Sequence, residues 1–135
     1  MPPQAPSTAI VVRGGDVQRA SVRSNPALSK LEFFSNFGGG YLVSAGIAEH
    51  PAGEGCGTHT HRGAVELFVV IGGSGVIEVD GVAYDVSVDD CVLVPVGANH
   101  NLIGTSTDAL FRVLYAFVVA PGHENGPVPW KSIQS

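Results

Sequence analysis

The segment GEGCGTHTHRGAVELFVVIGG, residues 53–73, decides most of what this sequence predicts. It opens with a glycine-dense loop, continues with two histidines one residue apart, His59 and His61, and ends in an apolar run that contains Glu66. Alternate residues of a β-strand point to the same side. We therefore expect the two imidazoles to project together, with Glu66, at the start of the next strand, close enough to reach the same point.

The surrounding sequence predicts an all-β fold in a single domain. The chain has 135 residues, of which 44% are hydrophobic and 14% charged, with 18 glycines and 9 prolines. This length fits one domain, and many valines and glycines favour short strands joined by tight turns. Asp80-Gly81, between two alternating segments, is the strongest hairpin signal. The pattern alone leaves an immunoglobulin-like sandwich and a jelly roll open.

Two segments near the N-terminus carry specific expectations. Residues 9–17, AIVVRGGDV, predict a first strand that ends at the glycine pair. Residues 25–34, NPALSKLEFF, favour a short helical turn, because Asn25 is placed to cap it and Pro26 stands at the first helical position.

Charge and composition exclude several classes of partner. Seven basic and twelve acidic residues give a formal charge of −5 without a run of like charge, so we expect no nucleic-acid or membrane partner. The N-terminus lacks the features of a signal peptide, and no apolar stretch approaches the roughly 18 to 20 residues that span a bilayer. Two separated cysteines do not indicate a disulfide framework, so we expect a cytoplasmic protein. The expected organisation is a flexible Pro-rich arm over 1–9, one domain over 10–120, and a tail over 121–135 that packs on the domain or trails from it.

A fourth candidate ligand, His100, follows a Pro95/Gly97 turn and lies on another predicted strand. Three imidazoles and one carboxylate suit Fe, Mn, Co, Ni, Cu or Zn and leave coordination positions open to water, substrate or dioxygen. The other two histidines, His50 and His123, are interpreted as ordinary surface or hydrogen-bonded residues. Spacing by itself leaves the choice between a metal site and polar decoration of a sheet open.

The two histidine-containing segments also carry a family resemblance. The spacing G-x5-H-x-H-x4-E-x6-G over residues 53–73 resembles the first motif of the cupin superfamily, and P-x-G-x-x-H over residues 95–100 resembles the core of its second motif. The resemblance covers roughly residues 41–118. It departs from the family at Asp89, where the second motif usually starts with Gly, and at Gly104, where it usually closes with Asn. Neither position binds metal in cupins.

The resemblance implies a double-stranded β-helix, or jelly-roll barrel, with one mononuclear divalent transition metal near its mouth. Carried over residue by residue, the ligands are His59, His61, Glu66 and His100. Small cupins of this kind are usually homodimers that trade or share N-terminal strands. Three outward apolar residues of the central strand serve such a contact or are buried against the second layer of the barrel; they are Leu67, Val69 and Ile71.

The implied function is that of a metal-dependent enzyme. Such a centre holds dioxygen together with a chelating substrate, or acts as a Lewis acid in lyase, decarboxylase, isomerase or cyclase chemistry. Both reactions need a small carboxylate- or enol-bearing molecule. The alternatives are a small-molecule-binding or sensory cupin without turnover, and a cupin whose metal is purely structural.

Candidate substrate residues follow from strand alternation. Phe68 shares the face of Glu66, and Leu102 shares that of His100. The segment ALFRVLYAFVV, residues 109–119, predicts one more strand. Its inward face consists either of Leu110, Arg112 and Leu114 or of Phe111, Val113 and Tyr115. An inward Arg112 would clamp a substrate carboxylate, whereas an outward one would be solvated.

The mouth and the overall lining are predicted from the remaining pattern. Tyr41, with the aromatic group Phe33, Phe34 and Phe37, is placed to close the mouth, although core packing suits at least two of these. The inferred lining is mostly apolar, which favours a small organic substrate over a sugar.

Overall fold

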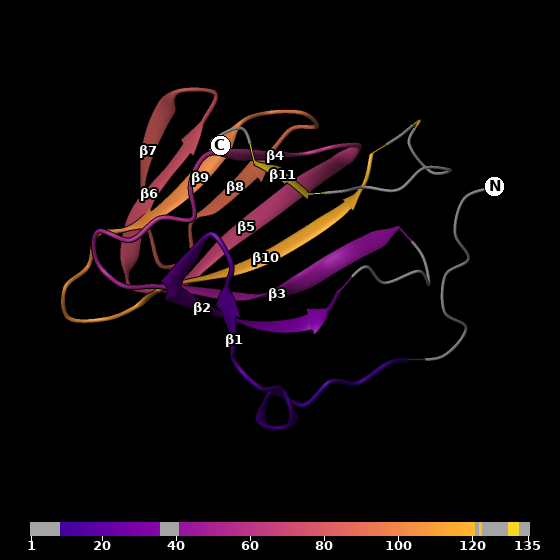
Figure 1. Ribbon diagram of the computed structural model, residues 1–135, viewed down its shortest axis with the longest axis horizontal. Helices are drawn as coiled ribbons and strands as arrows, with labels where there is room; N and C mark the ends of the chain where they lie inside the picture. The colour runs from indigo at the N-terminus through magenta and orange to yellow at the C-terminus, as the bar shows by residue number, and fades with distance from the viewer. Residues whose placement is uncertain (1–8, 36–40, 121, 123–129, 133–135) are drawn as a thin grey trace.

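The computed structural model describes residues 9–35, 41–120, 122 and 130–132, and it consists of two antiparallel sheets that face each other (Figure 1). A 3-10 turn, η1 (Gly14–Asp16), precedes the first strand. The six-stranded sheet has, in spatial order, β1 (Ala20–Val22), β2 (Asn25–Phe34), β3 (Leu42–His50), β10 (Phe111–Val119), β5 (Ala64–Gly72) and β8 (Cys91–Val94). The five-stranded sheet has β11 (Trp130–Ser132), β4 (His59–His61), β9 (His100–Gly104), β6 (Ser74–Val79) and β7 (Val82–Ser87). This arrangement confirms the predicted all-β jelly-roll fold.

Strand alternation builds a core between the sheets. On β5, Phe68 and Val70 are buried while Leu67 and Ile71 are exposed on the other face, as the period of two requires. Their inward partners come from both sheets, so one apolar layer holds the two together. The core comprises Phe68, Val70, Ile77, Val86, Val94, Ala98, Leu102, Phe111, Val113 and Tyr115.

The orientation of β10 settles which of its residues face inward. Phe111 and Val113 are fully buried, which places Arg112 on the outer face of the sheet. There Arg112 Nε donates to Oε2 of Glu49, its register partner on β3, at 3.0 Å. The hypothesis that Arg112 clamps a substrate is therefore corrected, because its side chain and the inner cavity lie on opposite sides of one strand.

The predicted hairpin at Asp80-Gly81 is present between β6 and β7, where Val79 pairs with Val82. Both turn residues have positive φ, 48° and 81°, as a two-residue turn matched to strand twist requires. Asp80 further fixes the turn, because its Oδ1 accepts from the backbone N of Asn99 at 2.9 Å. The hairpin is thus tied to the loop that leads into His100.

Both N-terminal predictions are wrong in detail. Residues 25–34 form strand β2 rather than a helical turn. Asn25 Oδ1 does accept from the backbone N of Ala27 at 3.0 Å, which is the local contact that the capping signal anticipated. Pairing with β3 nevertheless gives the segment its backbone partners, and Leu28 and Leu31 become buried. Within the described residues 9–13 no strand is assigned, and the first strand begins at Ala20.

The two departures from the cupin motifs have conformational explanations. Asp89 has φ +77°, a left-handed conformation that Gly adopts freely and Asp tolerates better than most residues. A Cβ on Gly104 would lie 2.6 Å from Pro51 O and 2.7 Å from His50 O. Glycine is therefore required there by the close approach of another chain segment.

The ends of the chain are described only in part. Trp130–Ser132 pairs antiparallel with β4, so this part of the tail adds a strand to the smaller sheet. The predicted arm over 1–9 lies almost wholly outside the described residues, as do Phe37 and His123. Among the described segments, none forms a helix with the length and apolarity needed to cross a bilayer.

Candidate metal centre

The four predicted ligands meet at one buried point between the two sheets. His59 and His61 project from β4 to the same side, and the register partner of His59 on the neighbouring strand β9 is His100. Glu66 approaches from β5 of the opposite sheet. All four residues are buried, and one donor atom from each lies within 4.8 Å of the others. The alternation of β4 thus places both imidazoles as the sequence predicted.

Backbone carbonyls fix the tautomers of two of the imidazoles. His59 Nδ1 lies 2.8 Å from Gly57 O, and His100 Nδ1 lies 3.1 Å from Ala98 O. A carbonyl oxygen only accepts, so each Nδ1 carries the proton and each Nε2 carries a lone pair. This is the arrangement by which proteins orient histidine ligands toward a metal.

The contacts of Glu66 show why the arrangement needs a cation. Glu66 Oε1 lies 3.1 Å from His61 Nε2 and 2.9 Å from His100 Nε2. Despite these distances, neither contact has hydrogen-bond geometry: Glu66 Oε1 and His100 Nε2 are buried without a hydrogen-bond partner among the described residues. The lone pair of His100 Nε2 therefore faces a carboxylate oxygen, which is unfavourable unless a positive charge lies between the two.

A single first-row divalent ion fits this donor set. Metal–nitrogen and metal–oxygen bonds of about 2.0–2.2 Å place opposite donors about 4 Å apart, close to the spread of up to 4.8 Å found here. Three nitrogens and one oxygen suit Fe, Mn, Co, Ni, Cu or Zn, and they do not select among these metals. The orphaned buried atoms and the chemistry of the donors thus both support a metal site.

The protonation states are also those that a metal requires. Burial, reinforced by the nearby His100, lowers the pKa of His59 to about 4, so this imidazole is neutral at pH 7. Burial alone would raise the pKa of Glu66, but interactions with His100 and His61 outweigh it and leave that pKa lowered. A neutral imidazole and an ionised carboxylate bind a cation without first releasing protons.

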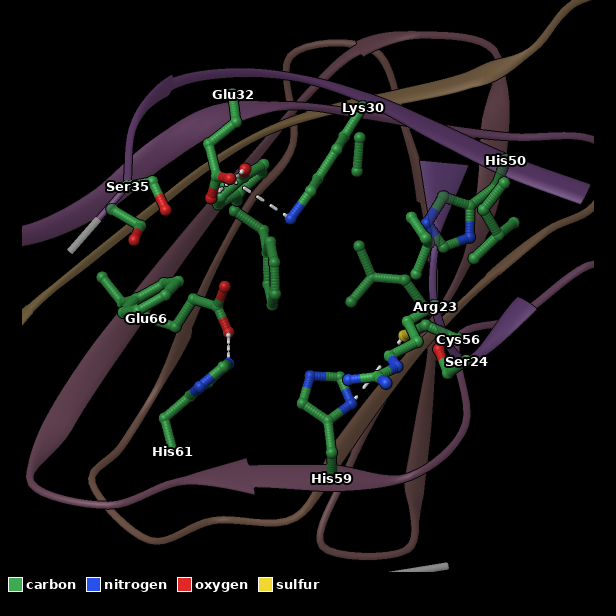
Figure 2. Close-up of a pocket in the computed structure, with 18 of the residues that line it drawn as sticks. Arg23, Ser24, Lys30, Glu32, Ser35, His50, Cys56, His59, His61 and Glu66 are labelled. Carbon is green, nitrogen blue, oxygen red and sulfur yellow. Dashed lines mark hydrogen bonds and ion pairs between the residues drawn. The ribbon is translucent and has the colours of Figure 1, made fainter. Parts of the chain in front are cut away.

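The centre opens into a cavity of about 510 Å³, and His59, His61 and Glu66 stand in its wall (Figure 2). Of the predicted substrate residues, Phe68 and Leu102 line this cavity. Tyr41 does not line it and is 46% exposed near the start of β3. Phe117, which the sequence did not single out, also lines the cavity and stacks on the His61 ring, with centroids 4.5 Å apart and planes at 17°.

A polar wall of the cavity was missed by the sequence prediction. It comes from the β1–β2 hairpin, and Figure 2 shows Arg23 and Lys30 directed into the cavity. Three alternate residues of β2 face the cavity, namely Leu28, Lys30 and Glu32. Had residues 25–34 been interpreted as a strand, this alternation would have predicted that the three side chains share one face. The lining is mostly apolar, as expected, and the structure adds a charged side that the sequence prediction did not include.

The charged side is organised by hydrogen bonds and an ion pair. Lys30 Nζ lies 3.4 Å from Glu32 Oε2, and Tyr115 Oη donates to Glu32 Oε1 at 3.2 Å. Burial, followed by the nearby Glu32, raises the pKa of Tyr115, so its hydroxyl stays protonated and donates.

Cys56 lines the cavity next to the metal ligands. Its Sγ lies 3.8 Å from His59 Nδ1, and burial raises the pKa of its thiol. Cys56 and Cys91 are both free, as the sequence predicted.

Comparisons with known proteins agree with this fold. The family model described as Cupin domain matches residues 46–125. A structure described as a predicted oxalate decarboxylase from Thermotoga maritima is similar at TM-score 0.69 and 20% identity, covering 82% of this chain and 99% of that one. A sugar phosphate isomerase of the cupin superfamily from Silicibacter pomeroyi has TM-score 0.69 and 17% identity, covering 83% and 77%.

A salicylate 1,2-dioxygenase from Pseudaminobacter salicylatoxidans has TM-score 0.61 and 21% identity, covering 77% of this chain and 29% of its own. At these identities the likeness concerns the fold. No curated protein sequence matches the chain.

Proposed function

This chain belongs to the cupin domain family, and we propose that it is a metal-dependent enzyme acting on a small carboxylate- or enol-bearing organic molecule. The reaction is either a dioxygenation or a Lewis-acid reaction of the lyase, decarboxylase, isomerase or cyclase type. One divalent transition metal per chain, held by His59, His61, Glu66 and His100, is its cofactor.

The observation that supports turnover is the position of the donors in a cavity wall. A metal that only tied strands together would need no access, and its donors would enclose it. Here His59, His61 and Glu66 line a cavity of about 510 Å³, which is within the range of small-molecule sites. A substrate in this cavity can therefore reach the centre.

The residues around the centre have separable tasks. The metal, when bound, supplies either Lewis-acid activation of a chelating group or reactivity with dioxygen. Phe68, Leu102 and Phe117 form an apolar side that keeps water from the reacting atoms. The Tyr115 hydroxyl donates its hydrogen to Glu32 and so holds this carboxylate in the cavity wall.

The names of the similar structures support a class of chemistry rather than one reaction. They include a predicted decarboxylase, a sugar phosphate isomerase and a dioxygenase, and their common element is the cupin fold. The charged wall formed by β1 and β2 is compatible with polar, anionic substrates.

We further propose that the chain is a cytoplasmic homodimer. The unpaired cysteines favour a reducing compartment.

The dimer is supported by three adjacent large apolar side chains on the outer face of β5 and β8, which are unusually exposed: Leu67 at 37%, Ile71 at 40% and Leu93 at 63%. A second copy on this face would cover them, and a monomer in analytical ultracentrifugation would contradict this arrangement.

The proposed function is tested by metal analysis of protein purified without oxygen, followed by oxygen uptake with a panel of 2-oxo acids and hydroxybenzoates. We expect about one metal ion per chain, and turnover of at least one compound that disappears together with the metal in His61→Ala. Activity that survives metal loss would contradict the proposal. A compound bound tightly but recovered unchanged would favour the binding role, and a metal inaccessible to added ligands would favour the structural one.

A further inference from the structure

Outside the metal centre, the cavity wall and the chain as a whole have opposite charge. The chain has a formal charge of −5. Apart from the metal ligands, however, the charged residues of the cavity wall are the two cations Arg23 and Lys30 and the single carboxylate Glu32. A cationic lining attracts an anionic ligand into the cavity, whereas the negative charge on the rest of the protein repels such a ligand.

The two cations differ in what they already bind. Lys30 lies 3.4 Å from Glu32, so most of its charge is matched inside the protein. Arg23, in the part of the chain that the structure describes, makes neither an ion pair nor a side-chain hydrogen bond. It occupies the two-residue turn between β1 and β2, where Val22 pairs with Asn25, and the turn directs it into the cavity (Figure 2).

The other arginines near this sheet are occupied elsewhere. Arg19 and Arg112 both donate to Glu49 on the outer face. The guanidinium that faces the cavity is thus Arg23, and its planar donor fork matches a carboxylate in a bidentate geometry. Ser21 and Ser24 line the same wall and add hydroxyl groups around that position.

We propose that Arg23 binds a carboxylate of the substrate that is remote from the metal-chelating group. The inference rests on the proposed function and narrows its substrate class to molecules with two anionic poles. One pole chelates the metal between His59, His61, Glu66 and His100, and the other pairs with Arg23 at the β1–β2 turn. Arg23 is a specificity-determining residue in this scheme, and it takes the role that the sequence assigned to Arg112.

The experiment uses the full chain loaded with Co²⁺, whose visible absorption reports ligands at the metal. The probes are 2-oxoglutarate and 2-oxopentanoate, which share a chelating head and a five-carbon chain and differ in the remote carboxylate. The pair 2-oxoadipate and 2-oxohexanoate repeats the comparison with one more methylene. For at least one pair we expect the dicarboxylate to bind about tenfold more tightly to the wild type, as one charge-assisted bidentate contact implies.

Substitution of Arg23 separates the remote contact from the head group. Arg23→Gln is expected to bring the affinity ratio to about one while leaving the affinities for Co²⁺ and 2-oxopentanoate unchanged. Arg23→Lys retains the positive charge without the planar donor fork, and we expect it to keep an affinity ratio of about three. Arg13→Gln is the matched control, because Arg13 is also exposed but does not line the cavity, and it should leave the ratio at its wild-type value.

The outcomes distinguish this inference from the proposed function. Keto acids that perturb the Co²⁺ absorption without a preference for the dicarboxylate, or with a preference that survives in Arg23→Gln, overturn the role of Arg23 alone. A Co²⁺ centre whose absorption no keto acid changes speaks against the proposed function, and it overturns the role of Arg23 with it.

Discussion

Two buried carboxylates stand in the same sheet on opposite faces, and their surroundings differ in one decisive respect. Glu49, on β3, is 2% exposed and lies on the outer face, where Arg19, Arg112 and Ser29 all donate to it. Glu66, on β5, is 5% exposed on the inner face and meets imidazoles instead. Two of the partners of Glu49 are permanent cations, whereas those of Glu66 are imidazoles.

These surroundings separate a structural buried charge from a functional one. A carboxylate whose hydrogen bonds and charge are matched by arginines is complete when the chain folds. A carboxylate that faces imidazoles is completed by a bound cation, so its main contribution is to binding that cation rather than to folding. The two sites should therefore fail in opposite ways when each carboxylate is removed.

The largest expected effect is on metal affinity in Glu66→Gln. Loss of a ligand is more severe than loss of a residue that merely orients one, which costs about 10- to 100-fold, so we expect a fall in affinity of more than about 100-fold. At a Co²⁺ concentration 100 times the wild-type Kd, the metal stabilises the wild type by about 2.7 kcal/mol, and the variant should lose this gain.

Thermal unfolding with and without Co²⁺ measures this effect. Without metal, Glu66→Gln should lose less stability than Glu49→Gln, because its removal leaves no permanent cation without a partner. A metal-free variant that loses as much stability as Glu49→Gln would show that Glu66 is structural in the manner of Glu49.

The second effect is on folding stability in Glu49→Gln. This substitution leaves two arginines without their shared negative charge and turns an NH2 group toward them, and we expect a cost of about 1–3 kcal/mol at pH 7. Affinity for Co²⁺ should stay within about twofold of the wild type, since the side chain lies on the far face of the sheet. Urea unfolding measures the loss of stability, and calorimetric titration measures the affinity for Co²⁺. A large loss of metal affinity would contradict the assignment of Glu49 to a purely structural role.

The third effect is a pH dependence that belongs to Glu49. Hydrogen bonding to Arg19 lowers the pKa of Glu49 from 4.5, even though burial opposes it. A carboxylate with a depressed folded pKa contributes stability that is fully present above its unfolded pKa and is lost as the pH falls through the folded value. The stability difference between wild type and Glu49→Gln should therefore be constant from pH 7 to about 5.5 and shrink below 4.5.

Urea unfolding of both metal-free proteins across this range measures the difference. The contribution of Glu66 is present in both proteins and cancels. A difference that grew as the pH fell would contradict the assignment of the ion pairs to Glu49.

The metal ligands were accessible to sequence analysis because their geometry is local. One residue between His59 and His61 places both on one face of any strand. Glu66 and His100 were candidates from their positions, and the resemblance to the cupin motifs selected them as the other two ligands. The fold followed from the same segments, since turn signals such as Asp80-Gly81 act over a few residues.

The charged wall of the cavity could not be predicted from the sequence, because the local signals for a helical turn and for a strand were equally good over residues 25–34. Asn25 does make the capping-type contact that its sequence context predicts, but strand pairing with β3 overrides the helical preference. That interpretation concealed the alternation that brings Lys30 and Glu32 inward. On β10 both faces are largely apolar, so periodicity alone did not determine whether Arg112 or Tyr115 faced the cavity.

The smallest effect concerns Arg112 and tests its reassignment to the outer face. Arg112→Gln removes one of two arginines from Glu49, while Arg19 remains with its Nε 2.6 Å from Glu49 Oε1. Because the Arg112 side chain is 35% exposed and its partner keeps other donors, we expect a loss of about 0.5–1 kcal/mol. The preference for dicarboxylate over monocarboxylate 2-oxo acids should be unchanged, in contrast to Arg23→Gln. A variant that keeps its stability but loses that preference would return Arg112 to the cavity and break the division between the two faces, because one strand residue cannot serve both.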